Sequence, residues 1–101
     1  MIRHIVMWKL NLGDRPEEKM TSGDLIVKSI ISLKAKIPEI VDINAYINHE
    51  DAPKNNYDVV LDATFKSMND LEKYQVHPEH QNVAALIKDR VSDRSAIDVE
   101  I

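Results

Sequence analysis

Two hydrophobic periodicities follow one another along this chain, and their order constrains the fold more than any single motif does. Apolar residues alternate with polar ones in some segments and recur every three or four residues in others. The first pattern is typical of strands and the second of helices. The strand-like segments are residues 1–10, 40–48, 57–66 and 94–101, and the helix-like segments are residues 14–36 and 67–90. The sequence therefore predicts the element order β-α-β-β-α-β.

This element order is the split βαβ arrangement of ferredoxin-like domains, an α+β fold. Because βαβ crossovers are right-handed, we expect both helices on one face of a four-stranded antiparallel sheet with strand order 4-1-3-2. A chain of 101 residues fits one domain, residues 1–101, with a modest core. In the last strand, the alternation predicts that Ile97, Val99 and Ile101 face the helices.

The face of this sheet that has no helix to cover it also carries apolar side chains. Among its polar residues lie Ile5, Met7, Tyr46 and Val60. A small domain that exposes such a half-apolar face to water gains stability by burying it against a second copy. We therefore expect a homodimer formed through the helix-free sheet face.

The second helix-like segment is interrupted at Tyr74-Gln-Val-His-Pro-Glu-His80. A residue before proline is pushed out of the α region, so His77 is expected to bend or cap the helix. Pro78 then suits the first position of a new helix, where its missing N–H costs nothing. His80 falls in the first turn of that helix and shares a face with the apolar residues that follow at i+3, i+4 and i+7. Its imidazole is therefore expected to point inward, where it is either hydrogen-bonded structurally or used in chemistry.

A second histidine falls on an apolar face near the start of the chain. His4 lies between Ile2 and Val6 on one side of the first strand. For His4 and for His80 taken alone, a hydrogen-bonded core residue competes with a functional one. The residues by themselves leave both interpretations open.

Charge and composition argue against several classes of partner. The formal net charge is −4, with 13 basic against 17 acidic residues, and no segment is basic enough to suit a nucleic acid. No apolar run is long enough for a membrane span, and no signal peptide is recognisable. The absence of cysteine removes thiolate chemistry and suits the reducing cytoplasm, where we expect the protein. No spacing of histidines and carboxylates is diagnostic of a metal site, so we expect no metal and no cofactor.

The same segments resemble a known family, the stress-responsive dimeric α/β-barrel (Dabb) domain. The resemblance spans essentially the whole chain and is carried by Ile2-Arg-His-Ile-Val-Met-Trp-Lys9, the strand from Tyr57 to Phe65 and Tyr74-Gln-Val-His-Pro-Glu-His80. Its most specific part is the Tyr-x-x-His-Pro-x-His motif together with a histidine in the first strand. The resemblance implies a homodimer whose two sheets form a barrel with the helices outside. In members with an assigned activity, it also implies a pocket between the sheet and the helices.

In olivetolic acid cyclase-like members, the resemblance implies aldol-type cyclisation of a linear polyketide thioester. Matched by motif, the residues of that site fall on His4, Tyr74 and His80, which are the candidate catalytic residues of this chain. A further tyrosine of that site, in the first helix, corresponds to Ile30 here. This departure argues against the same substrate.

The three residue types suggest how such a site would work. The partial positive charge of a helix N-terminus disfavours imidazolium, so His80 is expected to be neutral and able to take a proton α to a carbonyl. The Tyr74 hydroxyl is suited to donate to a developing enolate oxygen, and His4 is suited to hydrogen-bond a carbonyl. Nothing in the sequence supports a covalent nucleophile.

Three functions follow as hypotheses. The first is a homodimeric pocket protein for a small carbonyl or polyketide-like ligand, with a cofactor-independent cyclase, lyase or isomerase activity if it is an enzyme. The second is a non-catalytic stress-responsive or regulatory dimeric module whose histidines are structural. The third is a monooxygenase-like relative within the dimeric α/β-barrel superfamily. A cavity lined by His4, Tyr74 and His80 would favour the first over the second.

Overall fold

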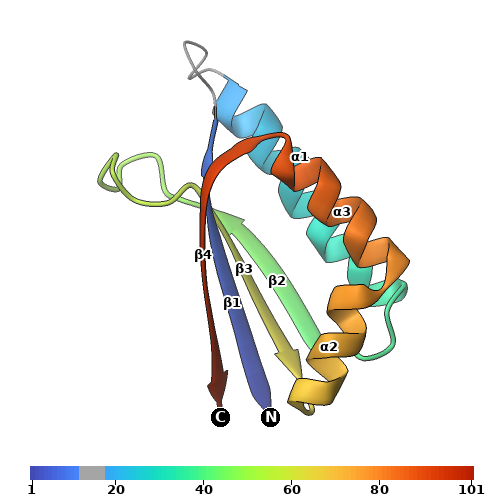
Figure 1. Cartoon of the computed structure of the whole chain (residues 1–101). Helices are drawn as coiled ribbons and strands as arrows, with labels where there is room; N and C mark the ends of the chain where they lie inside the picture. Colours follow the sequence, from blue (N-terminus) through green and yellow to red (C-terminus); the bar gives the residue numbers. More distant parts are fainter. Residues whose placement is uncertain (12–17) are drawn as a thin grey trace.

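The computed structural model describes residues 1–11 and 18–101 (Figure 1). Its elements follow the predicted order, with the second helix-like segment divided into two helices. They are β1 (Ile2–Leu10), α1 (Lys19–Ser32), the short 3₁₀ helix η2 (Leu33–Ala35), β2 (Asp42–Ile47), β3 (Val59–Phe65), α2 (Met68–Val76), α3 (Pro78–Lys88) and β4 (Val91–Glu100). The predicted start of the first helix, at residue 14, lies outside the described residues. Within the described ranges, no helix is long and apolar enough to span a membrane.

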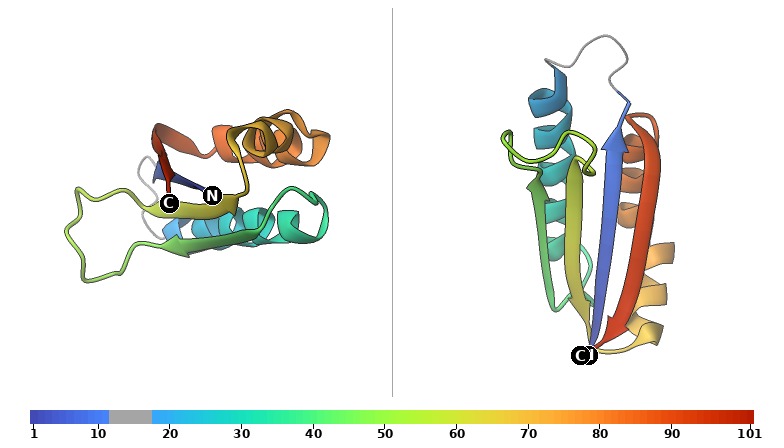
Figure 2. Two further views of the ribbon diagram at one scale, coloured as in Figure 1. Left: turned by 90° about the horizontal axis from the view of Figure 1, so that it is seen from below. Right: turned by 90° about the vertical axis from the view of Figure 1, so that its left-hand side faces the viewer.

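The strands form one antiparallel sheet in the order β2-β3-β1-β4, which confirms the predicted topology. β1 is central and pairs with β3 on one side and β4 on the other, so Val6 lies opposite both Leu61 and Ala96. The right-hand view of Figure 2 shows the sheet in front and α1, α2 and α3 behind it, on one face. The arrangement is the predicted ferredoxin-like fold.

The hydrophobic core lies between the sheet and this helical layer. Ile26, Ile30 and Leu33 are almost fully buried on the side of α1 and η2 that faces the sheet, and Phe65 is buried at the end of β3. Each such side chain stabilises the fold by about 1.5–3 kcal/mol through removal of apolar surface from water. α3 packs more closely against α1 than against the sheet. Space therefore remains between α3 and the strands that it covers.

The alternation of β4 is the reverse of the prediction. We predicted that Ile97, Val99 and Ile101 face the helices, and this prediction is wrong. Ile97 lies opposite Ile5 on the helix-free face and is 58% exposed, while Ile101 is 64% exposed. The register of β4 with β1 determines which side chains of β4 face the helices, because a shift of one residue moves every side chain of a strand to the other face of the sheet.

The observed register brings charged residues to the helix-covered face of β4. Asp98 lies opposite His4, and Arg94 lies opposite Trp8. His4 and Trp8 are both buried beneath the helical layer. Because directly paired residues of antiparallel strands share a face, Asp98 and Arg94 are directed toward the space between the sheet and α3.

His77 separates α2 from α3 and caps both. Its backbone is extended, with φ −65° and ψ 135°, which ends α2. Its Nδ1 atom accepts a hydrogen bond from the backbone N–H of Glu79 at 3.1 Å, so the side chain is the N-cap of α3. Pro78 follows in the first turn, as expected. The predicted cap is confirmed, and it fixes His80 in the first turn of α3.

Candidate functional site

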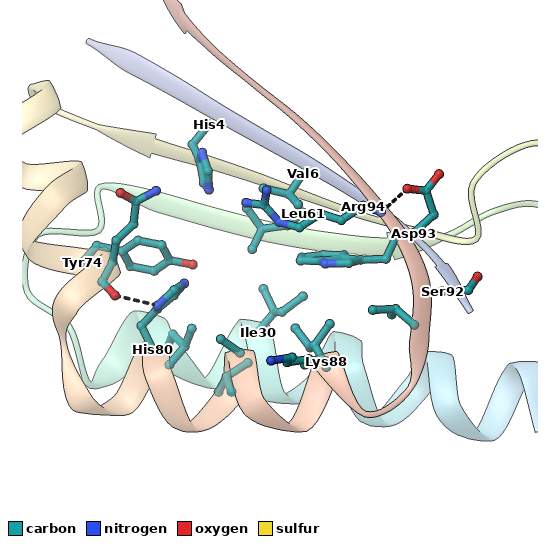
Figure 3. Close-up of a pocket in the computed structure, with 17 residues that line it drawn as sticks. His4, Val6, Ile30, Leu61, Tyr74, His80, Lys88, Ser92, Asp93 and Arg94 are labelled. Atoms are coloured by element: carbon teal, nitrogen blue, oxygen red, sulfur yellow. Dashed lines mark hydrogen bonds between the residues drawn. The ribbon is translucent and has the colours of Figure 1, made fainter. Parts of the chain in front are cut away.

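A cavity of about 670 Å³ lies between the sheet and α3. Its volume falls in the range of small-molecule pockets. His4, Tyr74 and His80 gather at one end of it, and much of the remaining wall is apolar (Figure 3). The structure therefore brings all three sequence-predicted residues into one cavity, each from a different element.

His80 presents one nitrogen of its ring to this cavity. Its Nδ1 atom lies 3.0 Å from the backbone carbonyl oxygen of Gln75, and since a carbonyl only accepts, Nδ1 carries the donated hydrogen. Nε2 is then the unprotonated nitrogen of the neutral ring, and Figure 3 shows this side of the ring turned toward the cavity. Burial lowers the pKa of His80 from its ordinary value of 6.5; the hydrogen bond to the Gln75 carbonyl opposes this shift, and the charge of Arg94 acts in the same direction as burial. The neutral form that we predicted is therefore favoured, with burial as its main cause.

Tyr74 packs against His80. It is buried within the protein and forms part of the cavity wall. It is 1% exposed, and its ring centroid lies 4.4 Å from that of His80 and 6.2 Å from that of His4. Burial raises the pKa of Tyr74 well above its usual range, so the hydroxyl keeps its proton at physiological pH. Among the described residues, no protein group hydrogen-bonds this hydroxyl, and it is not sealed from the cavity. The hydroxyl is thus a hydrogen-bond donor available to a ligand.

His4 is held by a carboxylate that the sequence analysis missed. The side chain is 3% exposed, and its Nδ1 atom is hydrogen-bonded to Oδ1 of Asp98 on the neighbouring strand. A carboxylate accepts, so Nδ1–H donates and Nε2 is left on the side that faces Tyr74 and His80 (Figure 3). Arg94, Ala96 and Asp98 alternate along β4 and lie opposite Trp8, Val6 and His4, which are buried residues of β1. This alternation is the signal that could have identified Asp98, but it can be used only when the register is known.

The remaining histidines lie outside the cavity lining. His77 caps α3, and His49 lies exposed in the loop after β2, where its Nδ1 accepts a hydrogen bond from the backbone of Asp51 at 2.9 Å. In the part of the chain that the structure describes, no three histidine, aspartate or glutamate side chains converge as metal ligands. Ile30, in the first helix, lines the cavity and contributes an apolar side chain to its wall.

Comparisons with known proteins agree with this fold. A search of curated proteins finds no match. A dimeric protein of unknown function with a ferredoxin-like fold from Bacteroides fragilis is 28% identical, with a TM-score of 0.89 over 99% of this chain and 95% of that one. A dimeric ferredoxin-like protein from Thermobifida fusca is 26% identical, with a TM-score of 0.82 over 99% of this chain and 90% of that one. The hydroxynitrile lyase of Passiflora edulis, 16% identical with a TM-score of 0.79 over 99% of this chain and 92% of that one, shares the fold.

The family comparison covers almost the whole sequence. The model described as the stress responsive A/B barrel domain matches residues 2–101. That range contains β1 with His4, the break between α2 and α3 with its Tyr-x-x-His-Pro-x-His motif, and β4. The chain belongs to the stress responsive A/B barrel domain (Dabb) family.

Proposed function

We propose that this protein binds a small carbonyl compound in the cavity and removes a proton from the carbon next to the carbonyl group. The reaction would be of the cofactor-independent cyclase, lyase or isomerase type, with His80, Tyr74 and His4 as catalytic residues. One observation carries the proposal. The ring of His80, whose Nδ1 is hydrogen-bonded to Gln75, packs against the ring of Tyr74, whose hydroxyl has no hydrogen-bond partner among the described residues, and both residues line a cavity of ligand size.

The proposed reaction begins with proton transfer. Nε2 of His80 takes the α-proton, and the electron pair of the broken C–H bond moves to the carbonyl oxygen to form an enolate. The Tyr74 hydroxyl donates a hydrogen bond to that oxygen, where negative charge develops. In a cyclisation, the enolate carbon then forms a bond to a second carbonyl carbon of the same substrate. The resulting alkoxide takes the proton back from His80, which restores the neutral imidazole.

His4 has a supporting place in this scheme. Its Nε2 side faces Tyr74 and His80, so it can hydrogen-bond the carbonyl oxygen when that nitrogen carries a proton. The carboxylate of Asp98 stabilises positive charge on the ring and fixes its orientation. We propose Asp98 as a positioning residue that acts through His4.

A non-catalytic role for the same histidines is the competing function, and a specific observation favours it. His80 and His4 each make one hydrogen bond within the protein, to Gln75 and Asp98, which satisfies part of their polar surface. A buried histidine held only for packing would make the same contacts. The two functions differ in whether the second nitrogen of each ring is used.

Solvent deuterium exchange tests the proposed function without knowledge of the natural substrate. Butyrophenone, an uncharged aryl ketone, is incubated with the protein in deuterium oxide, and loss of its α-hydrogen signal is followed by proton NMR. We expect the protein to accelerate exchange over buffer, because the cavity places a base beside a hydrogen-bond donor. A His49→Gln variant, altered in the exposed loop, is expected to match the unmodified protein. Exchange at the buffer rate would contradict the proposal.

The pH dependence of this exchange follows from the lowered pKa of His80. Only the neutral ring accepts a proton, so the rate should rise as pH rises through the pKa of His80 and then level off, with a midpoint below 6.5. Stability should change in the same sense, because between the folded pKa and 6.5 the unfolded chain binds more protons than the folded one. Rate measurements over a range of pH and NMR titration of the His80 ring check this. A midpoint at or above 6.5 would contradict it.

We further propose that the protein is a homodimer formed through the helix-free sheet face. Solved structures similar to this chain include dimeric proteins, which supports an assembly of this kind. On this face Met7 is 36%, Tyr46 57% and Ile97 58% exposed, and Ile5 and Val60 lie among them. Burial of such a surface stabilises association. We place this dimer in the cytoplasm, where a cysteine-free chain needs no oxidising environment.

Light scattering at micromolar concentration is expected to give twice the chain mass of 11.6 kDa. Ile97→Lys should shift the protein toward the monomer, because it places a charge in the proposed interface. Ile31→Lys is the matched control, since Ile31 is 47% exposed on α1, away from the sheet face. A single species of 11.6 kDa for the unmodified chain, or equal effects of the two variants, would overturn the proposed interface.

A further inference from the structure

Arg94 extends from β4 into the cavity. It lies opposite Trp8 in the sheet register, on the helix-covered face, and it lines the cavity. Figure 3 shows its side chain running from β4 toward the end of the cavity that holds His4, Tyr74 and His80. The residue is also exposed to solvent, so a ligand can meet the guanidinium without first breaking a contact within the protein.

The positive charge of Arg94 has no partner of its own in the described part of the chain. Asp98, on the same face of β4, bonds His4, and Asp93 accepts hydrogen bonds from the Tyr57 hydroxyl and from the backbone N–H of Arg94. Neither carboxylate pairs with the guanidinium. Lys88 lines the cavity as well, and residues 1–11 and 18–101 contain no ion-pair partner for it. Of the Lys, Arg, Asp and Glu residues that line the cavity, Lys88 and Arg94 are cationic and Asp93 is anionic, and neither cation is paired with a carboxylate in the described residues.

The charge of Arg94 also acts at the proposed reaction centre. Burial is the main influence on the pKa of both Tyr74 and His80, and Arg94 contributes a lowering to each. The guanidinium is thus within electrostatic range of both groups. Arg94 lies four residues from Asp98 along β4, but its side chain runs toward the histidine end, so the guanidinium lies nearer to that end than the strand spacing alone would place it. A single ligand can therefore contact the guanidinium of Arg94 while its reacting group lies at the histidine end.

We propose that the substrate carries a carboxylate that Arg94 binds while the reacting carbonyl lies at the histidine end of the cavity. The planar guanidinium matches a carboxylate with two parallel hydrogen bonds, and the apolar residues of the cavity wall suit the hydrocarbon part of the ligand. The substrate class is then a keto acid. The position of the carbonyl rests on the proposed function of His80, whereas the carboxylate contact is independent of it.

A matched pair of ligands tests the carboxylate contact. The probe is 5-oxo-5-phenylpentanoate, and its uncharged counterpart is the primary amide of the same acid. Calorimetric titration of the unmodified protein is expected to show binding of the carboxylate about tenfold tighter than of the amide, because a charge-assisted bidentate contact is lost in the amide. Arg94→Gln should bind both compounds equally. Arg90→Gln, at a residue just before β4 whose Nη1 donates to the backbone of Leu86, should keep the preference.

A third variant separates failure of this inference from failure of the proposed function. His80→Gln should keep the preference for the carboxylate, even though its α-proton exchange is lost. Equal binding of carboxylate and amide by the unmodified protein, or no binding of either at millimolar concentration, would overturn the inference and leave butyrophenone exchange as the test of His80. Tighter binding of the corresponding phosphate monoester than of the carboxylate would also overturn it, since the anion would then be a phosphate.

Discussion

Replacing His80 with glutamine is expected to slow α-proton exchange on the order of 10²–10⁴-fold, the usual loss on removal of a general base. Glutamine has a similar length, and its amide can donate to the backbone carbonyl of Gln75 as Nδ1 does now. It has no basic nitrogen to replace Nε2. The melting temperature should therefore change little while the exchange rate falls. NMR exchange rates and thermal melts of the two proteins check both parts.

His77→Gln is the informative control for this variant. His77 caps α3 through Nδ1, so its replacement should cost about 0.5–2 kcal/mol of stability without removing the base. If His80→Gln instead lowered stability and left exchange unchanged, the result would support the packing role of His80. A loss of roughly 0.5–3 kcal/mol, or about 4–8 °C per kcal/mol in a domain of this size, with unchanged exchange and ligand binding, would make His80 a structural residue.

Asp98→Asn is expected to reduce the exchange rate by roughly 10²-fold, with the larger part of the loss in kcat. Asparagine preserves the shape and can still hydrogen-bond His4. Its neutral amide does not stabilise a protonated imidazole, so His4 becomes a weaker donor to the enolate oxygen. Because the negative charge on that oxygen develops during the reaction, KM should change little. Steady-state exchange rates over a range of ketone concentrations measure the two constants separately.

Asp62→Asn is the matched control for Asp98. Asp62 also lies in a strand and pairs with a basic side chain, since Arg3 donates to it at 2.6 and 2.9 Å, but it faces away from the cavity. Exchange by this variant should equal that of the unmodified protein. If the two asparagine variants lost activity equally, or if Asp98→Asn changed only the melting temperature, Asp98 would have no positioning role.

Much of this architecture could be predicted from local sequence patterns. Alternation and helical spacing indicated the element order, and handedness then left one strand order, which the structure confirms. The break at His77 was predictable because proline restricts the residue before it. The inward direction of His80 followed from its spacing to the apolar residues of α3. These inferences succeeded because each depends on a few neighbouring residues.

The parts that could not be predicted depend on pairing between distant segments. Ile97 and Val99 alternate with Asp98, and the sequence alone does not say which set faces the helices. Apolar residues usually face the core, but β4 is an edge strand, and its apolar side lies on the helix-free face where a partner copy is proposed. Because we predicted that the apolar residues of β4 face the helices, we did not predict that Asp98 and Arg94 lie on the helix-covered face. The distance between α3 and the sheet, which creates the cavity, depends on how α3 packs on α1 and leaves no local signal.

The most direct test of the central claim is the stereochemistry of α-proton exchange. Nε2 of His80 approaches a bound ketone from one side, so we predict that the protein exchanges one of the two α-hydrogens of butyrophenone far faster than the other. Deuterium NMR in a chiral aligning medium distinguishes the two positions, and mass spectrometry should show that the singly deuterated ketone accumulates well before the doubly deuterated one forms. The same measurement on His80→Gln should give only slow exchange at both positions. Equal exchange of both hydrogens, at a rate unaffected by His80→Gln, would contradict the assignment of His80 as the base.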